Sequence, residues 1–208
     1  MSVKRVLAKV RKADLEYDLI NDGDYIGVGL SGGKDSSLLL YLLHLYQYLA
    51  AGSLDKNFKI IGIHIDLNFG EEDFKPVADF FKRYDIHLYE EKSLVADILK
   101  RNLKNDKIQC SLCSTLKKGA VIKAGKMLGC NKIAFGHHAD DAIETLLLNM
   151  IYGGRIATFD PKMHLDREDI TFIRPFILLH SIYHTYPQAK ENFLLALHNT
   201  DKVNLFKK

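Results

Sequence analysis

The segment at residues 30–37 combines glycine, hydroxyl and lysine side chains in a pattern that suits an anion. It lies between an apolar, strand-like run at residues 25–30 and a leucine-rich, helix-like run at residues 36–51. Glycines let backbone N–H groups close around a phosphate, and the start of the following helix adds positive charge. The spacing is not that of a Walker A motif, and an unspecialised glycine-rich turn is the alternative. The residues expected to bind nucleotide phosphates are Leu30, Ser31, Gly32, Gly33, Lys34, Asp35, Ser36 and Ser37.

A second polar group follows the strand-like run at residues 132–136 and opens a helix-like run at residues 139–152. Two imidazoles and two carboxylates there could bind Mg²⁺ together with phosphates, orient a substrate, or act as acid and base. Simple capping of the helix by an aspartate, with Glu144 completing a capping box, is the alternative. Asp35 likewise could bind metal or cap its helix. The candidates in this second group are Gly136, His137, His138, Asp140 and Asp141.

A third candidate lies at the end of the run at residues 59–66. Backbone groups there could recognise adenine, and Asp66 could reach a ribose or a metal ion. His64 is also compatible with an ordinary half-buried histidine. Both residues are included among the expected nucleotide contacts.

Two thiols three positions apart, Cys110 and Cys113, precede a helix-like run at residues 114–128. This spacing suits a metal ion, a cluster or redox chemistry. A closed zinc site needs four ligands, so it would have to borrow histidines or Cys130. The position of Cys130, just before a strand, instead predicts a small buried apolar residue near the amino end of the sheet.

Strand and helix patterns alternate along the chain, which predicts a parallel sheet with helices on both faces. Further strands are expected at residues 86–90 and 171–176, and further helices at residues 3–20, 72–84 and 93–102, with a loop at residues 153–169. Ligands in such folds bind beyond the carboxyl ends of the strands, where the strand order reverses. We expect an amphipathic helix in residues 1–22, one nucleotide-binding domain in residues 23–178 and a short helical segment in residues 179–208.

Composition describes an ordinary globular protein, with 47% hydrophobic and 26% charged residues in 208 and a net charge of +3. No apolar run is long enough for a bilayer, and residues 1–22 lack the apolar core of a secretory signal, so we expect a cytoplasmic protein without membrane contacts. Basic residues gather in the first twelve positions and at residues 92–126. Such a run is either a solvated helix face or part of an RNA-binding surface.

Taken together, five motifs resemble the tRNA 2-thiocytidine synthetases, PP-loop ATP pyrophosphatases related to the tRNA-Ile lysidine synthetases. The motifs are residues 31–37, residues 110–119, residues 132–145, residues 152–154 and residues 173–176. The resemblance implies an α/β fold, a single parallel-sheet three-layer domain of the adenine nucleotide alpha-hydrolase type. It also implies an enzyme that adenylates O2 of a cytidine in the tRNA anticodon loop and replaces that oxygen with sulfur.

The resemblance carries further expectations. ATP, Mg²⁺ and tRNA would bind, a protein such as a cysteine desulfurase would donate sulfur, and the chain could form a homodimer. Arg174 would join the nucleotide contacts, and a 4Fe-4S cluster would use Cys110 and Cys113. The residues expected to be catalytic are Lys34, Asp35, Cys110, Cys113 and Asp141.

One departure from the family concerns the third cluster thiolate. In the family it follows the strand at residues 171–176, whereas this chain has no cysteine after Cys130. His180 or His184 could replace it, zinc could replace the cluster, or no cluster forms. A nucleotide- or RNA-binding PP-loop protein without sulfur transfer therefore stays open as an alternative. A lysidine synthetase-like ligase is a second alternative, although Cys110 and Cys113 speak against it because that chemistry needs no thiols.

Overall fold

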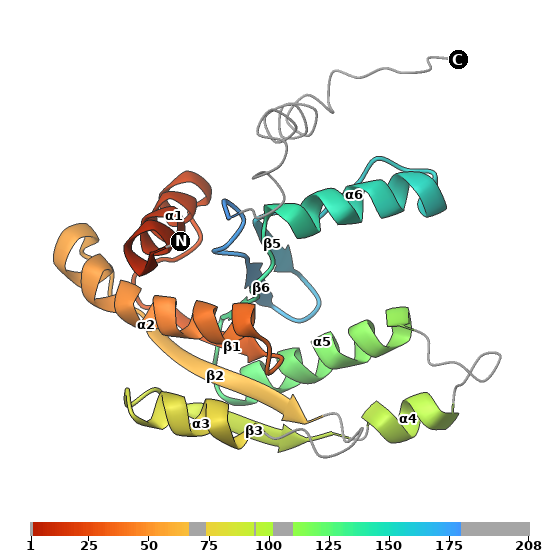
Figure 1. Ribbon diagram of the computed structural model, residues 1–208, viewed down its shortest axis with the longest axis horizontal. Helices are drawn as coiled ribbons and strands as arrows, with labels where there is room; N and C mark the ends of the chain where they lie inside the picture. Colours follow the sequence, from red (N-terminus) through yellow and green to blue (C-terminus); the bar gives the residue numbers. More distant parts are fainter. Residues whose placement is uncertain (1, 67–73, 94, 102–109, 180–208) are drawn as a thin grey trace, which may run out of the picture.

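The computed structural model contains a six-stranded sheet in the order β3-β2-β1-β4-β6-β5 (Figure 1). The structure describes residues 2–66, 74–93, 95–101 and 110–179. Neighbouring strands are parallel except β5 and β6, which form an antiparallel pair at one edge. The strands are β1 (Tyr25–Leu30), β2 (Lys59–Asp66), β3 (Leu88–Lys92), β4 (Lys132–Ala134), β5 (Lys162–Leu165) and β6 (Ile170–Ile173).

Helices cover both faces of the sheet, which gives the three layers that the sequence predicts (Figure 1). One apolar core joins a sheet face to α1, α2 and α3, and a second core joins the opposite face to α5. The helices are α1 (Val3–Tyr17), α2 (Lys34–Leu54), α3 (Lys75–Lys82), α4 (Val95–Arg101), α5 (Cys110–Met127) and α6 (Ala139–Gly153). Within the described residues, no helix is long and apolar enough to cross a membrane.

Strand β1 has large apolar residues on one face and glycines on the other. Its large residues Ile26, Val28 and Leu30 belong to the core under α1 and α2. The glycines face the other way, and a Cβ at Gly27 would lie 2.6 Å from Ile63 Cδ1. Neighbouring isoleucines therefore fill the space beside Gly27. This alternation follows from the period of two along a strand.

The strand order reverses between β1 and β4. From β1 the chain continues to β2 and β3 on one side, and then crosses to β4 on the other side of β1. The loops after β1 and β4 therefore meet at the carboxyl edge with a crevice between them. These loops carry residues 31–37 and 136–141, so the first two polar groups found in the sequence lie together.

Several features differ from the sequence-based expectations, among them β3, which is Leu88–Lys92 rather than residues 86–90, and β4, which ends at Ala134 rather than at residue 136. Residues 162–165 form strand β5, although we expected a loop throughout residues 153–169, and β6 ends at Ile173 rather than at residue 176. Helix α5 begins at Cys110, so the cysteine pair lies inside its first turn instead of preceding the helix. β5 has only four residues and follows a long irregular stretch, which leaves too short a pattern to detect.

A buried ion pair fastens the opposite, amino edge of the sheet. The Lys132 ammonium lies 2.7 Å from the Asp24 carboxylate, and both side chains are almost completely buried. Lys132 also donates to Leu19 O at 2.8 Å and to Asn21 Oδ1 at 2.7 Å. Because each charge has several partners, the burial cost is offset by hydrogen bonds. This edge is therefore structural.

Candidate nucleotide-binding and catalytic site

The loop after β1 is closed by its own serine hydroxyls. Ser36 Oγ accepts from Ser31 N at 3.1 Å and donates to Gly33 O at 3.1 Å, while Gly33 N donates to Ser31 Oγ at 3.3 Å. Gly32 has φ +76°, a left-handed conformation that favours glycine. The chain then enters α2 with Gly33 as its N-cap. The first backbone amides of a helix lack intrahelical acceptors, so this arrangement is one that can bind an anion.

The loop after β4 approaches this turn closely and then starts α6. His138 is the N-cap of α6, and its backbone N–H donates to Asp141 Oδ2 at 2.7 Å. Asp141 therefore performs the capping role that we had considered for Asp140, Asp141 or Glu144. A Cβ at Gly136 would lie 3.2 Å from the carbonyl carbon and oxygen of Asp35. Glycine at position 136 is what lets the two loops meet.

Gly136→Ala should weaken nucleotide binding, because the added methyl group meets backbone atoms that cannot rotate away. We expect a loss of about 1–3 kcal/mol in folding free energy, as for other overpacked sites, together with weaker ATP binding in calorimetry. The matched control is Gly119→Ala, since nothing lies within 4 Å of a Cβ at that position of α5. Equal ATP affinity in both variants would contradict the close-approach argument.

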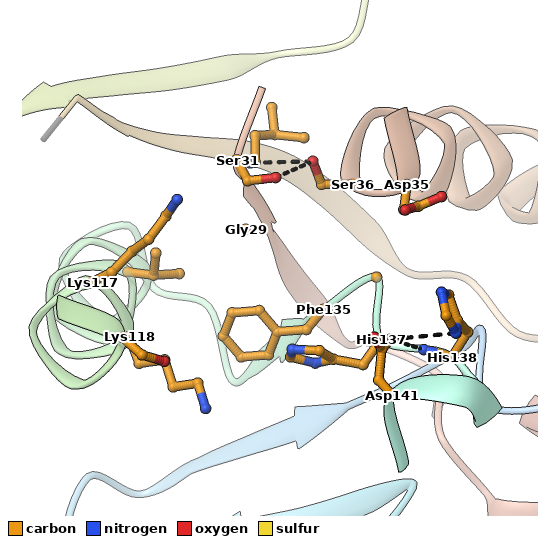
Figure 2. A pocket seen from close by; sticks show the side chains of 14 residues that line it. Gly29, Ser31, Asp35, Ser36, Lys117, Lys118, Phe135, His137, His138 and Asp141 are labelled. Atoms are coloured by element: carbon orange, nitrogen blue, oxygen red, sulfur yellow. Dashed lines mark hydrogen bonds and ion pairs between the residues drawn. The ribbon is translucent and has the colours of Figure 1, made fainter. Parts of the chain in front are cut away.

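The two loops and α5 enclose a cavity of about 320 Å³ (Figure 2). Lys117 and Lys118 bring two cations from α5, and Phe135 and His137 project from the loop after β4. The cavity thus has glycines and hydroxyls on one wall, cations on another and a carboxylate at its rim. The lining residues are Gly29, Leu30, Ser31, Asp35, Ser36, Ser114, Lys117, Lys118, Val121, Phe135, Gly136, His137, His138 and Asp141.

Several buried polar atoms around this cavity have no hydrogen-bond partner within the described residues. They include Ser37 Oγ and His137 Nδ1. Buried polar groups are nearly always paired in folded proteins, so a group of unpaired ones indicates a bound ligand or water. Their position beside the 31–37 loop agrees with a polar ligand there.

His137 is held neutral at physiological pH. Burial, and next the neighbouring Arg174 guanidinium, lower the pKa of His137 from 6.5 to about 4. A neutral imidazole can donate from one nitrogen and accept at the other. His137 therefore offers hydrogen bonds to a ligand, while the positive charge in the cavity comes from the lysines.

The low pKa of His137 predicts a loss of stability in mild acid. Between pH 6.5 and about 4 the unfolded chain binds a proton that the folded protein does not, so unfolding becomes easier as the pH falls. We expect a loss on the order of 2 kcal/mol across this window. Urea unfolding of His137→Gln at several pH values should show a shallower slope. His164→Gln, at a half-exposed position, serves as the control.

The structure brings together eight of the residues that the sequence nominated. The cavity is lined by Leu30, Ser31, Asp35, Ser36, Gly136, His137, His138 and Asp141. The nominated residues outside its lining include Lys34, which is exposed at the start of α2. Gly32 and Gly33 are exposed in the same loop, and Ser37 lies one residue beyond Ser36 in α2. Asp140 is 2% exposed and lies 3.8 Å from His138 Nδ1.

His64 and Asp66 line a different cavity, of about 470 Å³, beside the ends of β2 and β3. The His64 ring stacks on Phe74 with centroids 3.7 Å apart, and its Nδ1 lies 3.3 Å from Leu30 O. His64 is 4% exposed, which fits the ordinary buried histidine considered above. His64 thus contacts the last residue of β1 through Leu30 O.

Arg174 is buried behind the cavity. Its guanidinium lies 4.5 Å from the centre of the Phe159 ring and donates to Asp160 O. Burial lowers the pKa of Arg174 to about 10, so it stays charged. Arg174 is absent from the cavity lining and influences it through the field that it imposes on His137.

The cysteine pair in α5 and the third cysteine, Cys130, lie at opposite edges of the sheet. Cys110 is the first residue of α5, and Cys113 is half-buried in its first turn, one turn before Lys117. Cys130 is 6% exposed at the amino edge, and burial raises its pKa to about 11. The prediction for Cys130 is confirmed, and this residue cannot join the other two. In the part of the chain that the structure describes, no group of three metal-binding side chains forms.

The α5 lysines were not among the site residues expected from the sequence. Lys117 and Lys118 belong to the basic run and to the motif at residues 110–119, and both line the cavity. Their spacing from the cysteine pair could have indicated that they lie at the site. Lys117 follows Cys113 by four residues, which is about one helical turn and places both on the same side of a helix. Phe135 gave no signal apart from its place at the end of a strand.

Comparison with known proteins identifies the family. The family model for the PP-loop domain matches residues 3–193. The chain belongs to this family. The tRNA-cytidine(32) 2-sulfurtransferase of Geotalea daltonii (strain DSM 22248 / JCM 15807 / FRC-32) is 36% identical over 174 residues, covering 84% of this chain and 68% of that relative. The enzyme of the same name from Geobacter sulfurreducens (strain ATCC 51573 / DSM 12127 / PCA) is 32% identical, covering 91% and 72%. The resemblance found in the sequence is confirmed.

Other relatives of this PP-loop chain are longer. The chain spans 50% of the tRNA-cytidine(32) 2-sulfurtransferase of Paraburkholderia xenovorans (strain LB400), with 37% identity. Among solved structures, the U34-tRNA thiolase NcsA from Methanococcus maripaludis, determined with its 4Fe-4S cluster, has a TM-score of 0.65 and 22% identity. That match covers 91% of this chain and 63% of NcsA. It supports the α/β fold described above.

Proposed function

We propose that this chain uses ATP to adenylate O2 of a cytidine in a tRNA anticodon loop and then replaces that oxygen with sulfur. The observation that carries the proposal is the cavity between the loops after β1 and β4, which joins a phosphate-binding turn to two lysines and a carboxylate. Three relatives named tRNA-cytidine(32) 2-sulfurtransferase support the choice of substrate.

The residues that line the cavity would have two roles, to bind the phosphates of ATP and to stabilise charge during the reaction. Ser31, Ser36 and the first-turn amides of α2 would hold the phosphates of ATP. The nucleobase oxygen would attack the α-phosphorus, so that pyrophosphate leaves and C2 becomes electrophilic. A sulfur nucleophile then adds at C2, and AMP departs with the original oxygen. Lys117 would neutralise the negative charge that grows during both displacements.

Magnesium fits this cavity as a companion of ATP. Asp35 and Asp141 both line it, and Mg²⁺ is usually held by one or two carboxylates together with phosphate oxygens and water. When bound, the ion would screen the charge of the departing pyrophosphate. Asp141 would help to hold the ion, and the hydrogen bond by which it caps α6 would keep its carboxylate oriented.

The cysteines of this chain do not complete the three-thiolate set that a 4Fe-4S cluster of the implied kind requires. Cys110 and Cys113 both lie in the first turn of α5, whereas Cys130 lies at the far edge of the sheet. His180 and His184, the alternative third ligands, lie outside the described residues. We therefore assign no reaction step to a cluster, and the source of sulfur, including a cysteine desulfurase, stays a prediction.

Incubation of the anaerobically purified chain with ATP, Mg²⁺ and tRNA that lacks the modification tests the proposal. We expect release of AMP and pyrophosphate that depends on tRNA and, with a sulfur donor, 2-thiocytidine in digested tRNA by mass spectrometry. If neither product forms in the presence of sulfide, a persulfide donor or reconstituted iron and sulfur, thiolation by this chain is ruled out.

A second candidate is a nucleotide- and RNA-binding protein that has lost sulfur transfer, which the shortage of thiolates favours. It predicts ATP and tRNA binding without AMP release and without stoichiometric iron and sulfide. A lysidine synthetase-like ligase would instead incorporate lysine into tRNA. Adding labelled lysine to the same incubation distinguishes it from the other two.

A further inference from the structure

Helix α1 concentrates the positive charge of the protein. It carries five cations and two carboxylates, a net charge of +3, which equals the net charge of the whole chain. The rest of the chain is therefore neutral as a whole. One of the two carboxylates, Asp14, is buried and bonded to Tyr46 and Lys56. The surface of α1 thus presents five cations against one carboxylate, and the cations are Lys4, Arg5, Lys9, Arg11 and Lys12.

This distribution of charge is unfavourable for the helix by itself. Lys4 and Arg5 occupy the first turn, where no acidic residue balances the positive end of the helix and no side chain caps it. Arg5 and Lys9 are four positions apart, which places two like charges side by side. Glu16 compensates in part, at 3.9 Å from Lys12. A polyanion along this face would offset the repulsion, so the pattern favours a binding role over a stabilising one.

The apolar side of α1 is not available to a lipid bilayer. Val6, Val10 and Ala13 are buried in the core that α1 shares with α2. An amphipathic helix that binds a membrane must place such residues in the lipid. The outer face has a hollow of about 390 Å³ instead, lined by Ala8, Arg11, Lys12, Leu15 and Glu16. A hollow between cations suits a ridge of negative charge such as a phosphate backbone.

We propose that the outer face of α1 binds the phosphate backbone of tRNA outside the nucleotide that reacts. The inference rests on the proposed function, since it takes the same tRNA as the partner. A tRNA is far larger than the cavity of about 320 Å³, so most of its contacts must lie on the surfaces around that cavity. Phosphate contacts of this kind position a nucleic acid without reading its sequence.

The packing of α1 connects its basic face to the site. Val6 and Val10 share one core with Leu39 of α2 and with Phe176, which follows β6. Helix α2 begins directly after the phosphate-binding loop. The outer face of α1 is therefore the surface of the same layer that carries this loop, and one RNA molecule can contact both.

The salt dependence of tRNA binding tests the proposal. In Lys4→Gln/Arg11→Gln, two exposed cations on one side of α1 are replaced by a good helix former. In fluorescence anisotropy with labelled tRNA, the slope of log affinity against log salt concentration should become shallower by about 1 to 2, and affinity at physiological salt should fall roughly 10-fold. Urea unfolding checks that the variant keeps the fold.

The matched control is Lys82→Gln/Arg83→Gln at the end of α3, which removes the same two residue types from exposed positions. Helix α2 lies between α1 and α3 (Figure 1). Both double variants have the same net charge, so a loss confined to the α1 variant supports the proposal. Equal losses, or no loss in either variant, overturn it, while tRNA binding by the unmodified chain leaves the proposed function intact.

Two further outcomes decide against the inference in different ways. If the unmodified chain does not bind tRNA, the proposed function and the inference fail together. If the α1 variant binds tRNA normally but no longer binds phosphatidylserine vesicles that the unmodified chain binds, the face belongs to a membrane.

Lysine acetylation mapped by mass spectrometry gives a readout that needs no substitution. Saturating tRNA should protect Lys4, Lys9 and Lys12 several-fold, whereas labelling of Lys82 should stay unchanged. Equal labelling of the three α1 lysines with and without tRNA would contradict the proposal.

Discussion

Lys117→Met should reduce turnover by about 100- to 1,000-fold, the usual effect of removing one group that stabilises charge in the transition state. Lys117 extends from α5 into the cavity on the side of Ser31 (Figure 2). ATP binding in calorimetry should change much less, since the serines and first-turn amides of α2 remain. AMP release with saturating tRNA is the measurement.

The control for this prediction is Lys123→Met on the same helix. Lys123 is exposed and does not line the cavity, so its loss removes the same charge without touching the site. Turnover of Lys123→Met should stay close to that of the unmodified chain. If the two variants lose equal activity, general attraction of tRNA by α5 explains the effect, and a role for Lys117 in the reaction is excluded.

Lys132→Met should destabilise the fold by about 3–5 kcal/mol, because it leaves the buried Asp24 carboxylate without its cation. Asp24 Oδ2 lies 2.7 Å from the lysine ammonium, and Asp24 still accepts from Asn21 N and Asn131 Nδ2. Those hydrogen bonds keep Asp24 in place and therefore keep its charge buried. The free energy of unfolding in urea measures the loss.

Two companion variants isolate the cause of this loss. Lys59→Met, at an exposed position that starts β2, should change stability by less than about 0.5 kcal/mol. Asp24→Asn in the Lys132→Met background should recover part of the stability, since it removes the uncompensated charge. A double variant less stable than Lys132→Met alone would show that packing around the lysine stem, rather than the charge of Asp24, dominates.

The sequence predicted the α/β fold and the carboxyl-edge position of the site because both follow from local patterns. Strands β1 and β2 have the expected bounds, and Pro76 lies in the first turn of α3 as its stiff backbone favours. The loop at residues 31–37 could be recognised because its glycines, hydroxyls and flanking elements are contiguous. The 31–37 loop and residues 136–141 meet because parallel strands end at a common edge.

Other parts of the site depend on contacts between distant residues and could not be deduced in the same way. Lys34 is a residue type that commonly binds phosphate, yet at the start of α2 it is exposed and does not line the cavity. The lysine that does line it, Lys117, belongs to a helix more than eighty positions later in the sequence. Arg174 was expected among the nucleotide contacts, yet it is buried against Phe159 and does not line the cavity. The burial of Lys132 depends on its tertiary partners Asp24, Leu19 and Asn21, which the local sequence around the lysine does not reveal.

The reversal of strand order between β1 and β4 also has a consequence for how the protein matures. Tyr25 and Asn131, which join these strands at their amino ends, are 106 positions apart, so this pairing has a high contact order and closes slowly. During synthesis the phosphate-binding turn emerges long before its counterpart. A nascent chain arrested before β4 should therefore have no affinity for ATP, and the ability to bind nucleotide should arise in one step when the crossover through α5 is complete.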